Sequence, residues 1–224
     1  MRYFPITYHL CSLLFFSLGI TTFINGQQED FQSWNIISLS QPINSKYTAS
    51  LTTISRINDN VTRFNDISFD WRVNRKFKNG LSAQVSFRNW VFLQNDPIYF
   101  VWYDIIYVKK RTKYKWVNLL RLHHGLDWGD REQADFIRMK NYFFVNIDKA
   151  NKLAPFIGYD VWYKLSDDNR FQLIWLDSGI EYTMHKLRLR LNYRRIAPIG
   201  NAVGPRRDII LMGLFYTIYH ISNL

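Results

Sequence analysis

The chain has 224 residues, of which 47% are hydrophobic and 17% aromatic, and its formal net charge is +11 at pH 7. After residue 26 no apolar stretch approaches the ~18 residues that a transmembrane helix needs, which excludes helical spans from that part of the sequence. The positive charge alone would suit nucleic acid or an anionic membrane surface. The basic residues recur at strand spacing instead of clustering, however, so we expect no nucleic-acid partner.

The first 26 residues are typical of a secretory signal peptide. Arg2 precedes an apolar run from Leu10 to Ile20, and small and polar residues then lead to an expected cleavage site near Gly26-Gln27. The alternative, a membrane-anchoring helix, would need a longer apolar run. Cys11 is the single cysteine and lies within this segment, so a processed chain has no thiol for a disulfide or a cysteine-based metal site.

Residues 27–224 contain no Pro/Gly/Ser-rich linker, and we predict that they form a single domain. Strand-like segments recur along this domain, separated by turn residues. Together with the two arms of a hairpin within Asp66–Leu93, the predicted strands are Phe31–Leu39, Lys46–Arg56, Phe100–Lys110, Tyr114–Leu126, Phe136–Asp148, Leu153–Lys164, Phe171–Met184, Leu187–Arg195 and Asp208–Tyr219. Short turns alternate with longer loops between them.

The hairpin shows the pattern most clearly. In its first arm, apolar residues from Ile67 to Val73 alternate with polar ones, which is the period-two repeat of a strand. Asn79-Gly80 supplies the positive φ angles of a tight turn, and the second arm alternates in the same way. The hairpin therefore has one apolar face and one polar, charged face.

Two kinds of barrel could use such strands. A soluble, secreted ligand-binding barrel buries the apolar face, whereas an outer-membrane barrel turns that face to lipid and the polar face to its lumen. The predicted arms run about ten residues, which matches the ~9–11 of a membrane strand better than the ~5–6 of a typical globular strand. We therefore predict an all-β, antiparallel, up-and-down transmembrane barrel with short periplasmic turns and longer extracellular loops.

The count of segments is eleven, whereas bacterial single-chain barrels have even numbers of strands. We accordingly expect ten to twelve strands, with either one segment misassigned or the first one outside the wall. Aromatic residues toward strand ends would suit interfacial girdles or ordinary strand positions; these are Trp34, Phe77, Tyr99, Tyr114, Trp128, Tyr163 and Tyr219.

Charged side chains on the polar faces must point into the lumen if the barrel crosses a membrane, because a charge at lipid mid-depth costs about 2–4 kcal/mol. The predicted lumen-facing basic residues are Arg56, Arg72, Arg88, Arg121, Arg138, Lys140, Arg188, Arg190 and Arg194. Asp70, Asp160 and Glu181 are their predicted acidic partners. Such ions either pair across a narrow lumen and rigidify it, or line a pore that selects anions.

The sequence offers little for catalysis, metal binding or cofactors. His123 and His124 are adjacent in a predicted strand, so they point to opposite faces and cannot share one metal ion. His124 with a serine would suit an acyl hydrolase at the barrel rim, but no serine flanks it. Four carboxylates in one loop region are weak candidates for a divalent metal and lack the spacing of a calcium loop: Asp127, Asp130, Glu132 and Asp135. We expect no cofactor and no enzymatic activity.

The order of several residues resembles a family of outer-membrane proteins from Bacteroidota that is catalogued as domain of unknown function 2490. The residues that carry the resemblance are Trp34, Arg56, Arg138-Met-Lys140, Pro155-Phe156, Arg170 and Asp177-Ser-Gly-Ile180, and it extends over the whole processed chain. The resemblance implies a Gram-negative outer-membrane barrel. It brings no substrate, activity or catalytic residues.

The sequence thus predicts an outer-membrane barrel of unassigned activity, exported through the periplasm. A small porin-like channel that prefers anions is the first hypothesis for its role. The alternatives are a structural barrel with a plugged lumen, a lipid hydrolase, and a soluble ligand-binding barrel. Expected partners are outer-membrane lipid and lipopolysaccharide, the barrel-insertion machinery and small anionic solutes.

Overall fold

A computed structural model describes residues 30–93, 95–126, 135–148, 150, 152–165, 170–199 and 206–218. The predicted signal peptide lies outside the described residues. Eleven strands make up the fold: β1 (Asp30–Pro42), β2 (Tyr47–Asn58), β3 (Arg63–Lys76), β4 (Leu81–Phe92), β5 (Ile98–Lys110), β6 (Tyr114–Leu126), β7 (Asp135–Val145), β8 (Leu153–Leu165), β9 (Arg170–Met184), β10 (Leu187–Pro198) and β11 (Arg207–Thr217).

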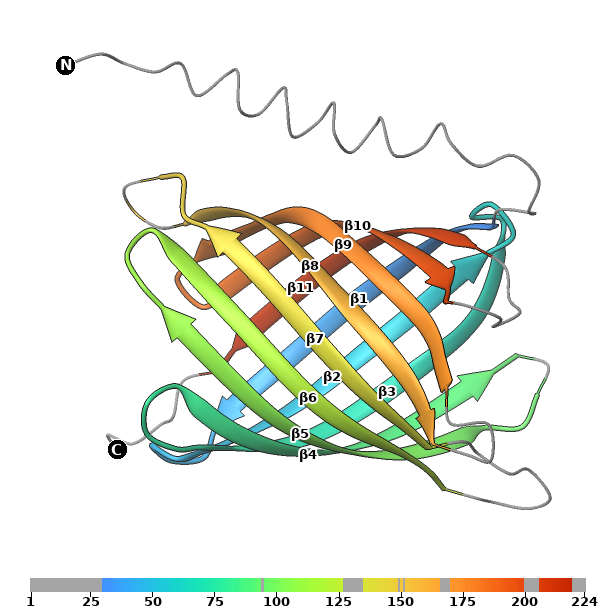
Figure 1. The fold of residues 1–224 in the computed structure, drawn as a ribbon, viewed down its shortest axis with the longest axis horizontal. Helices are drawn as coiled ribbons and strands as arrows, with labels where there is room; N and C mark the ends of the chain where they lie inside the picture. The colour runs from blue at the N-terminus through green and yellow to red at the C-terminus, as the bar shows by residue number, and fades with distance from the viewer. Residues whose placement is uncertain are drawn as a thin grey trace, which may run out of the picture.

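The strands form one sheet that closes on itself as a barrel (Figure 1). Each strand pairs antiparallel with the next one along the chain, and β1 pairs with β11 to complete the ring. Closure leaves no sheet edge with unpaired backbone groups. The predicted up-and-down barrel of ten to twelve strands is confirmed.

The closing pair is parallel, with Trp34 opposite Leu211 and Ser38 opposite Phe215. In an up-and-down barrel every second strand runs the same way, so strands one and eleven must have the same direction. The two explanations offered for the odd count were therefore both wrong. None of the eleven segments is misassigned, and the first one is part of the wall.

The connections differ in length between the two ends of the barrel, although less than predicted. At one end, which we call the short-turn end, the connections that follow the odd-numbered strands have two to seven residues. At the other end they have four to eight. The β3–β4 hairpin turns as predicted, because Asn79 and Gly80 have φ angles of 58° and 80°.

The two faces of the wall differ sharply in chemistry. Outward-facing positions are mainly large apolar residues that remain exposed: Trp71 is 57% exposed, Ile105 57% and Leu191 53%. Inward-facing positions in the same strands include Asp70 and Asp104, which are 0% and 2% exposed. The barrel therefore has an apolar exterior and a charged interior, the reverse of a water-soluble protein. In the part of the chain that the structure describes, no helix is both long and apolar enough to span a membrane.

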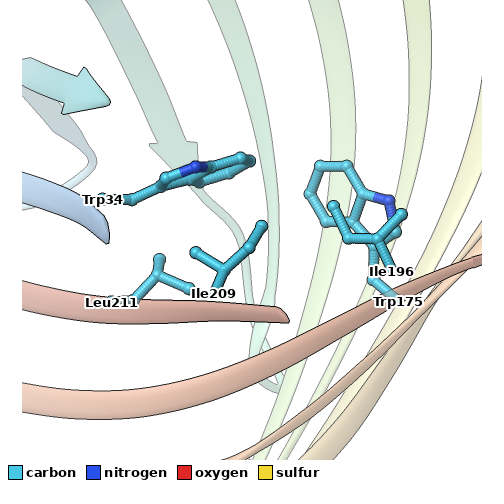
Figure 2. Close-up of a cluster of buried hydrophobic side chains, with 5 residues drawn as sticks. All are labelled: Trp34, Trp175, Ile196, Ile209 and Leu211. Carbon is cyan, nitrogen blue, oxygen red and sulfur yellow. The ribbon is translucent and has the colours of Figure 1, made fainter. Parts of the chain in front are cut away.

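Aromatic and aliphatic side chains also enter the interior. One cluster joins β1, β9, β10 and β11, and consists of Trp34, Trp175, Ile196, Ile209 and Leu211 (Figure 2). The rings of Trp34 and Trp175 meet edge to face with centroids 6.0 Å apart. The suggestion that Trp34 belongs to an outer aromatic girdle is thus wrong, because its side chain is buried inside the barrel. Trp128 and Tyr219 lie outside the described residues.

Candidate functional site: the charged barrel interior

All nine basic residues predicted to face the lumen lie on the inward side of the wall. Their strand positions share the parity of the buried residues, and five of the residues are buried: Arg56, Arg88, Arg121, Arg138 and Arg194. The other four are partly buried. Each of the nine lies within ion-pair distance of a carboxylate.

One group of charges crosses β3, β4, β5 and β6. Asp70 accepts hydrogen bonds from Arg88, which contacts both carboxylate oxygens, and from Arg72 at 2.6 Å. Asp104 accepts two hydrogen bonds from Arg121, at 2.6 and 2.7 Å. The Trp102 ring contacts both Arg88 and Arg121, with guanidinium carbons 4.2 and 3.9 Å from its centroid. Two-point ion pairs and cation–π contacts thus fix these side chains together.

A second group occupies the opposite part of the wall. Asp160 binds Arg138 at 2.5 Å and Lys140 at 2.9 Å, and Arg138 also stacks on the Trp162 ring at 3.4 Å. Asp177 accepts two hydrogen bonds from Arg194, at 2.7 and 3.0 Å. The hydroxyl of Tyr142 and the amide of Asn192 donate to the same carboxylate at 2.6 and 2.9 Å.

A third group lies toward the short-turn end. Glu181 accepts from Lys115 at 2.8 Å and from Arg190 at 2.5 Å, while Arg188 lies 3.8 Å away. Lys115 belongs to β6 and Glu181 to β9, so this pair connects strands that are not neighbours in the sheet. Arg190 on β10 also approaches the Phe144 ring of β7 at 5.5 Å. Side chains from separate parts of the wall therefore meet within the interior.

The fourth group lies toward the other end. Arg56 binds Asp66 at 2.5 Å and packs between two indole rings, those of Trp34 and Trp90, at 4.6 and 4.1 Å. Asp66 is 0% exposed. In all four groups, basic side chains pair with carboxylates, and several of them also lie on aromatic faces.

The structure adds interior residues that the sequence prediction missed. Asp66, Asp104, Asp177 and Lys115 all join the network, in addition to the predicted partners Asp70, Asp160 and Glu181. A signal existed for two of them: Asp66 is four residues from Asp70 and Asp177 four from Glu181, which places each pair on one face. Asp104 gave no such signal, since its strand is apolar on both faces.

The histidines take separate environments, as their adjacency in a strand predicts. His123 points inward among aromatic rings, and the Phe100 ring lies 4.4 Å from its own. His124 is on the outer wall, where its Nδ1 lies 2.8 Å from Asp135 Oδ1. The register places Val101 opposite His124 on β5, so this neighbour supplies no serine nucleophile.

Of the four weak metal candidates, the structure describes only Asp135. Asp127, Asp130 and Glu132 lie outside the described residues. Asp135 begins β7 and accepts hydrogen bonds within its own hairpin, from Gly125 N at 3.2 Å as well as from His124. Among the residues described, no group of three or more His, Cys, Asp and Glu side chains could hold a metal ion.

Comparisons of the chain with family models, with curated protein sequences and with solved structures gave no match.

Proposed function

We propose that this protein is an outer-membrane β-barrel with a closed interior, which acts as a structural element of the envelope and carries its connecting loops at the membrane surface. The reversed distribution of polarity supports the location most strongly. An exposed wall of Trp, Leu, Ile and Val suits hydrocarbon, while a soluble barrel of this kind would expose that entire apolar surface to water. The resemblance to the domain of unknown function 2490 family belongs to the same proposal.

The interior network favours the structural hypothesis over the anion channel. The arginines that would have to select anions are already paired with carboxylates, and those at mid-barrel are buried. The contact between Lys115 and Glu181 also runs between strands that are not neighbours. A conducting lumen would require these pairs to separate, leaving buried charges without partners at a cost of about 3–5 kcal/mol each.

The location is tested by fractionating the envelope and comparing boiled with unboiled samples on a gel. A closed barrel in the outer membrane resists detergent until it is heated, because every backbone group is paired around the ring. We expect the protein in the outer-membrane fraction, with a mobility that changes on boiling. Recovery in the aqueous fraction without detergent would contradict the location.

The closed interior is tested by adding purified protein to planar lipid bilayers. We expect no stepwise conductance from the wild type. Replacing Arg188, Arg190 and Arg194 together with glutamine is expected to leave the bilayers silent if the remaining pairs keep the interior filled. Reproducible ion currents from the wild type would contradict closure, and loss of their anion preference in the triple variant would instead support the channel.

A further inference from the structure

A polar cavity of about 330 Å³ lies inside the barrel at the short-turn end. It is bordered by β1 to β4 on one side and by β9 to β11 on the other. The residues that line it include Ser40, Ser50 and Thr217, which carry hydroxyls, and the basic residues Arg72 and Arg188. These five residues are inward-facing, so the cavity belongs to the barrel interior and not to the apolar outer wall.

Positive charge exceeds negative charge in the interior, and most of the excess lies beside this cavity. Within the ion pairs of the described interior, ten cations share six carboxylates. Glu181 serves three cations, and Asp70 serves two. Arg188 is one of the cations beside Glu181, and Arg72 is one of those beside Asp70. Of the four positive charges in excess within these ion pairs, three therefore belong to the Glu181 and Asp70 groups, which border the cavity.

The two cavity arginines retain hydrogen-bonding capacity. Arg72 donates to Asp70 through Nη2, its Nε is buried without a hydrogen-bond partner among the described residues, and its side chain as a whole is 25% exposed. Arg188 lies 3.8 Å from Glu181, beyond a good hydrogen bond, because Lys115 and Arg190 hold that carboxylate more closely. Its side chain is 40% exposed. Both guanidinium groups thus have N–H donors for an additional anionic ligand.

We propose that this cavity binds a small, water-soluble, hydroxylated anion of the sugar-phosphate class. Guanidinium groups recognise phosphate oxygens through paired N–H donors, and two of them suit a dianion. Serine and threonine hydroxyls suit the hydroxyls of a sugar. The volume is at the lower end of the range for ligand pockets, which restricts the ligand to a small molecule. The proposal does not depend on the membrane location, because the cavity would exist in any environment of the barrel.

The test is calorimetric titration of the purified full chain in detergent micelles and phosphate-free buffer. Glucose 6-phosphate, inorganic phosphate and glucose serve as probes. We expect saturable one-site binding of glucose 6-phosphate, weaker binding of inorganic phosphate and no measurable binding of glucose. The absence of saturable binding of either phosphate compound would overturn the proposal.

Substitutions distinguish the cavity from general attraction to a basic protein. Arg72→Gln and Arg188→Gln are each expected to weaken glucose 6-phosphate binding at least about tenfold, since each removes a charged donor. Arg75→Gln is the matched control, because Arg75 lies on the same strand near the same end but on the exposed outer wall. An equal loss in the control would overturn the proposal.

A further variant guards against misfolding of the arginine variants. Ser50→Leu adds bulk to the cavity wall without removing any charged group. We expect Ser50→Leu to abolish binding while the change in gel mobility on boiling stays as in the wild type. Unchanged binding in a folded Ser50→Leu protein would overturn the assignment to this cavity.

Discussion

Asp160 is the shared counter-charge of two interior cations, the buried Arg138 and the partly buried Lys140. Asp160→Asn keeps the shape of the side chain but leaves both cations without their carboxylate. Because an uncompensated buried charge costs about 3–5 kcal/mol, we expect the free energy of unfolding to fall by that amount. Equilibrium urea unfolding in detergent would measure the change.

Asp135→Asn provides the control for that substitution. Asp135 is also a carboxylate beside a basic side chain, but it lies on the outer wall, and its partner His124 is half exposed. Exposed pairs contribute about 0–1 kcal/mol, so we expect a small change in unfolding free energy. Equal effects of the two substitutions would mean that the interior is hydrated.

Two tryptophans at positions of opposite parity allow a second comparison of single residues. Trp102 is 1% exposed and lies between two guanidinium groups, whereas Trp71 is 57% exposed on the outer wall. Trp102→Leu is expected to lower the free energy of unfolding by about 3 kcal/mol, because it removes two cation–π contacts and leaves a cavity. If the outer wall faces lipid, Trp71→Leu should cost less than about 1 kcal/mol, since an outward leucine would still meet an apolar environment. Thermal unfolding followed by gel mobility would compare the two variants.

Inward-facing residues can be predicted from sequence only where the two faces of a strand differ clearly in polarity. In β10, Leu189 and Leu191 alternate with arginines, so the parity of the charges could be read directly. In β5, Phe100 and Trp102 share a face with Asp104, and aromatic residues occupy the other face as well. Trp34 was misassigned for a related reason. An interior rich in arginine accepts aromatic rings, and periodicity alone does not distinguish such a ring from one in a girdle.

At the scale of the strand, arginine substitutions in β10 and β9 can test whether the outer wall faces lipid. Leu191 is 53% exposed in the body of the strand, while Met184 is 43% exposed at the end of β9. If this wall faces lipid, Leu191→Arg should cost about 2–4 kcal/mol, and Met184→Arg near the interface about 0–1 kcal/mol. Folding into lipid vesicles across a urea series would measure both. Similar, small effects would indicate that the wall faces water.

The seam between β1 and β11 can be tested by cross-linking. Asn35 and Met212 are partners in this parallel pair and point outward. In a Cys11→Ser background, cysteines at both positions are expected to react with a short bifunctional thiol reagent and to alter the mobility of the denatured chain. A control pair, Asn35→Cys with Leu191→Cys, places the second thiol on β10, which does not pair with β1. Cross-linking of the control but not the test pair would contradict the parallel closure.

Segment by segment, the strands were largely predictable, because period-two alternation and turn residues such as Asn79-Gly80 are local signals. The contacts between strands were not. Lys115 and Glu181 are separated by 66 residues, and their meeting depends on the tilt and stagger of the whole sheet. The stagger between strands cannot be derived from periodicity and turn residues in one sequence.

At the scale of the whole molecule, the sequence predicted a closed barrel and an approximate strand number but not the manner of closure. The expectation of an even count came from known bacterial barrels, and it made the odd number look like an error of assignment. Backbone geometry imposes no such condition, since a parallel pair satisfies the same hydrogen-bonding groups as an antiparallel one. The eleven segments were correct, and the assumption about the seam was not.

The parallel seam also determines how the chain could be re-engineered. β1 begins at one rim of the barrel and β11 ends at the other. The two points are therefore separated by the full height of the wall. In an even-stranded barrel a hairpin-length linker could join the corresponding points and allow circular permutation. Here such a linker would have to follow the eleven residues of β11 for roughly 36 Å, either outside the wall or through the filled interior. We therefore expect permutants with short linkers to fail to fold. If the barrel spans a membrane as proposed, tags placed before β1 and after β11 of the native order should be reached by antibodies from opposite faces of that membrane.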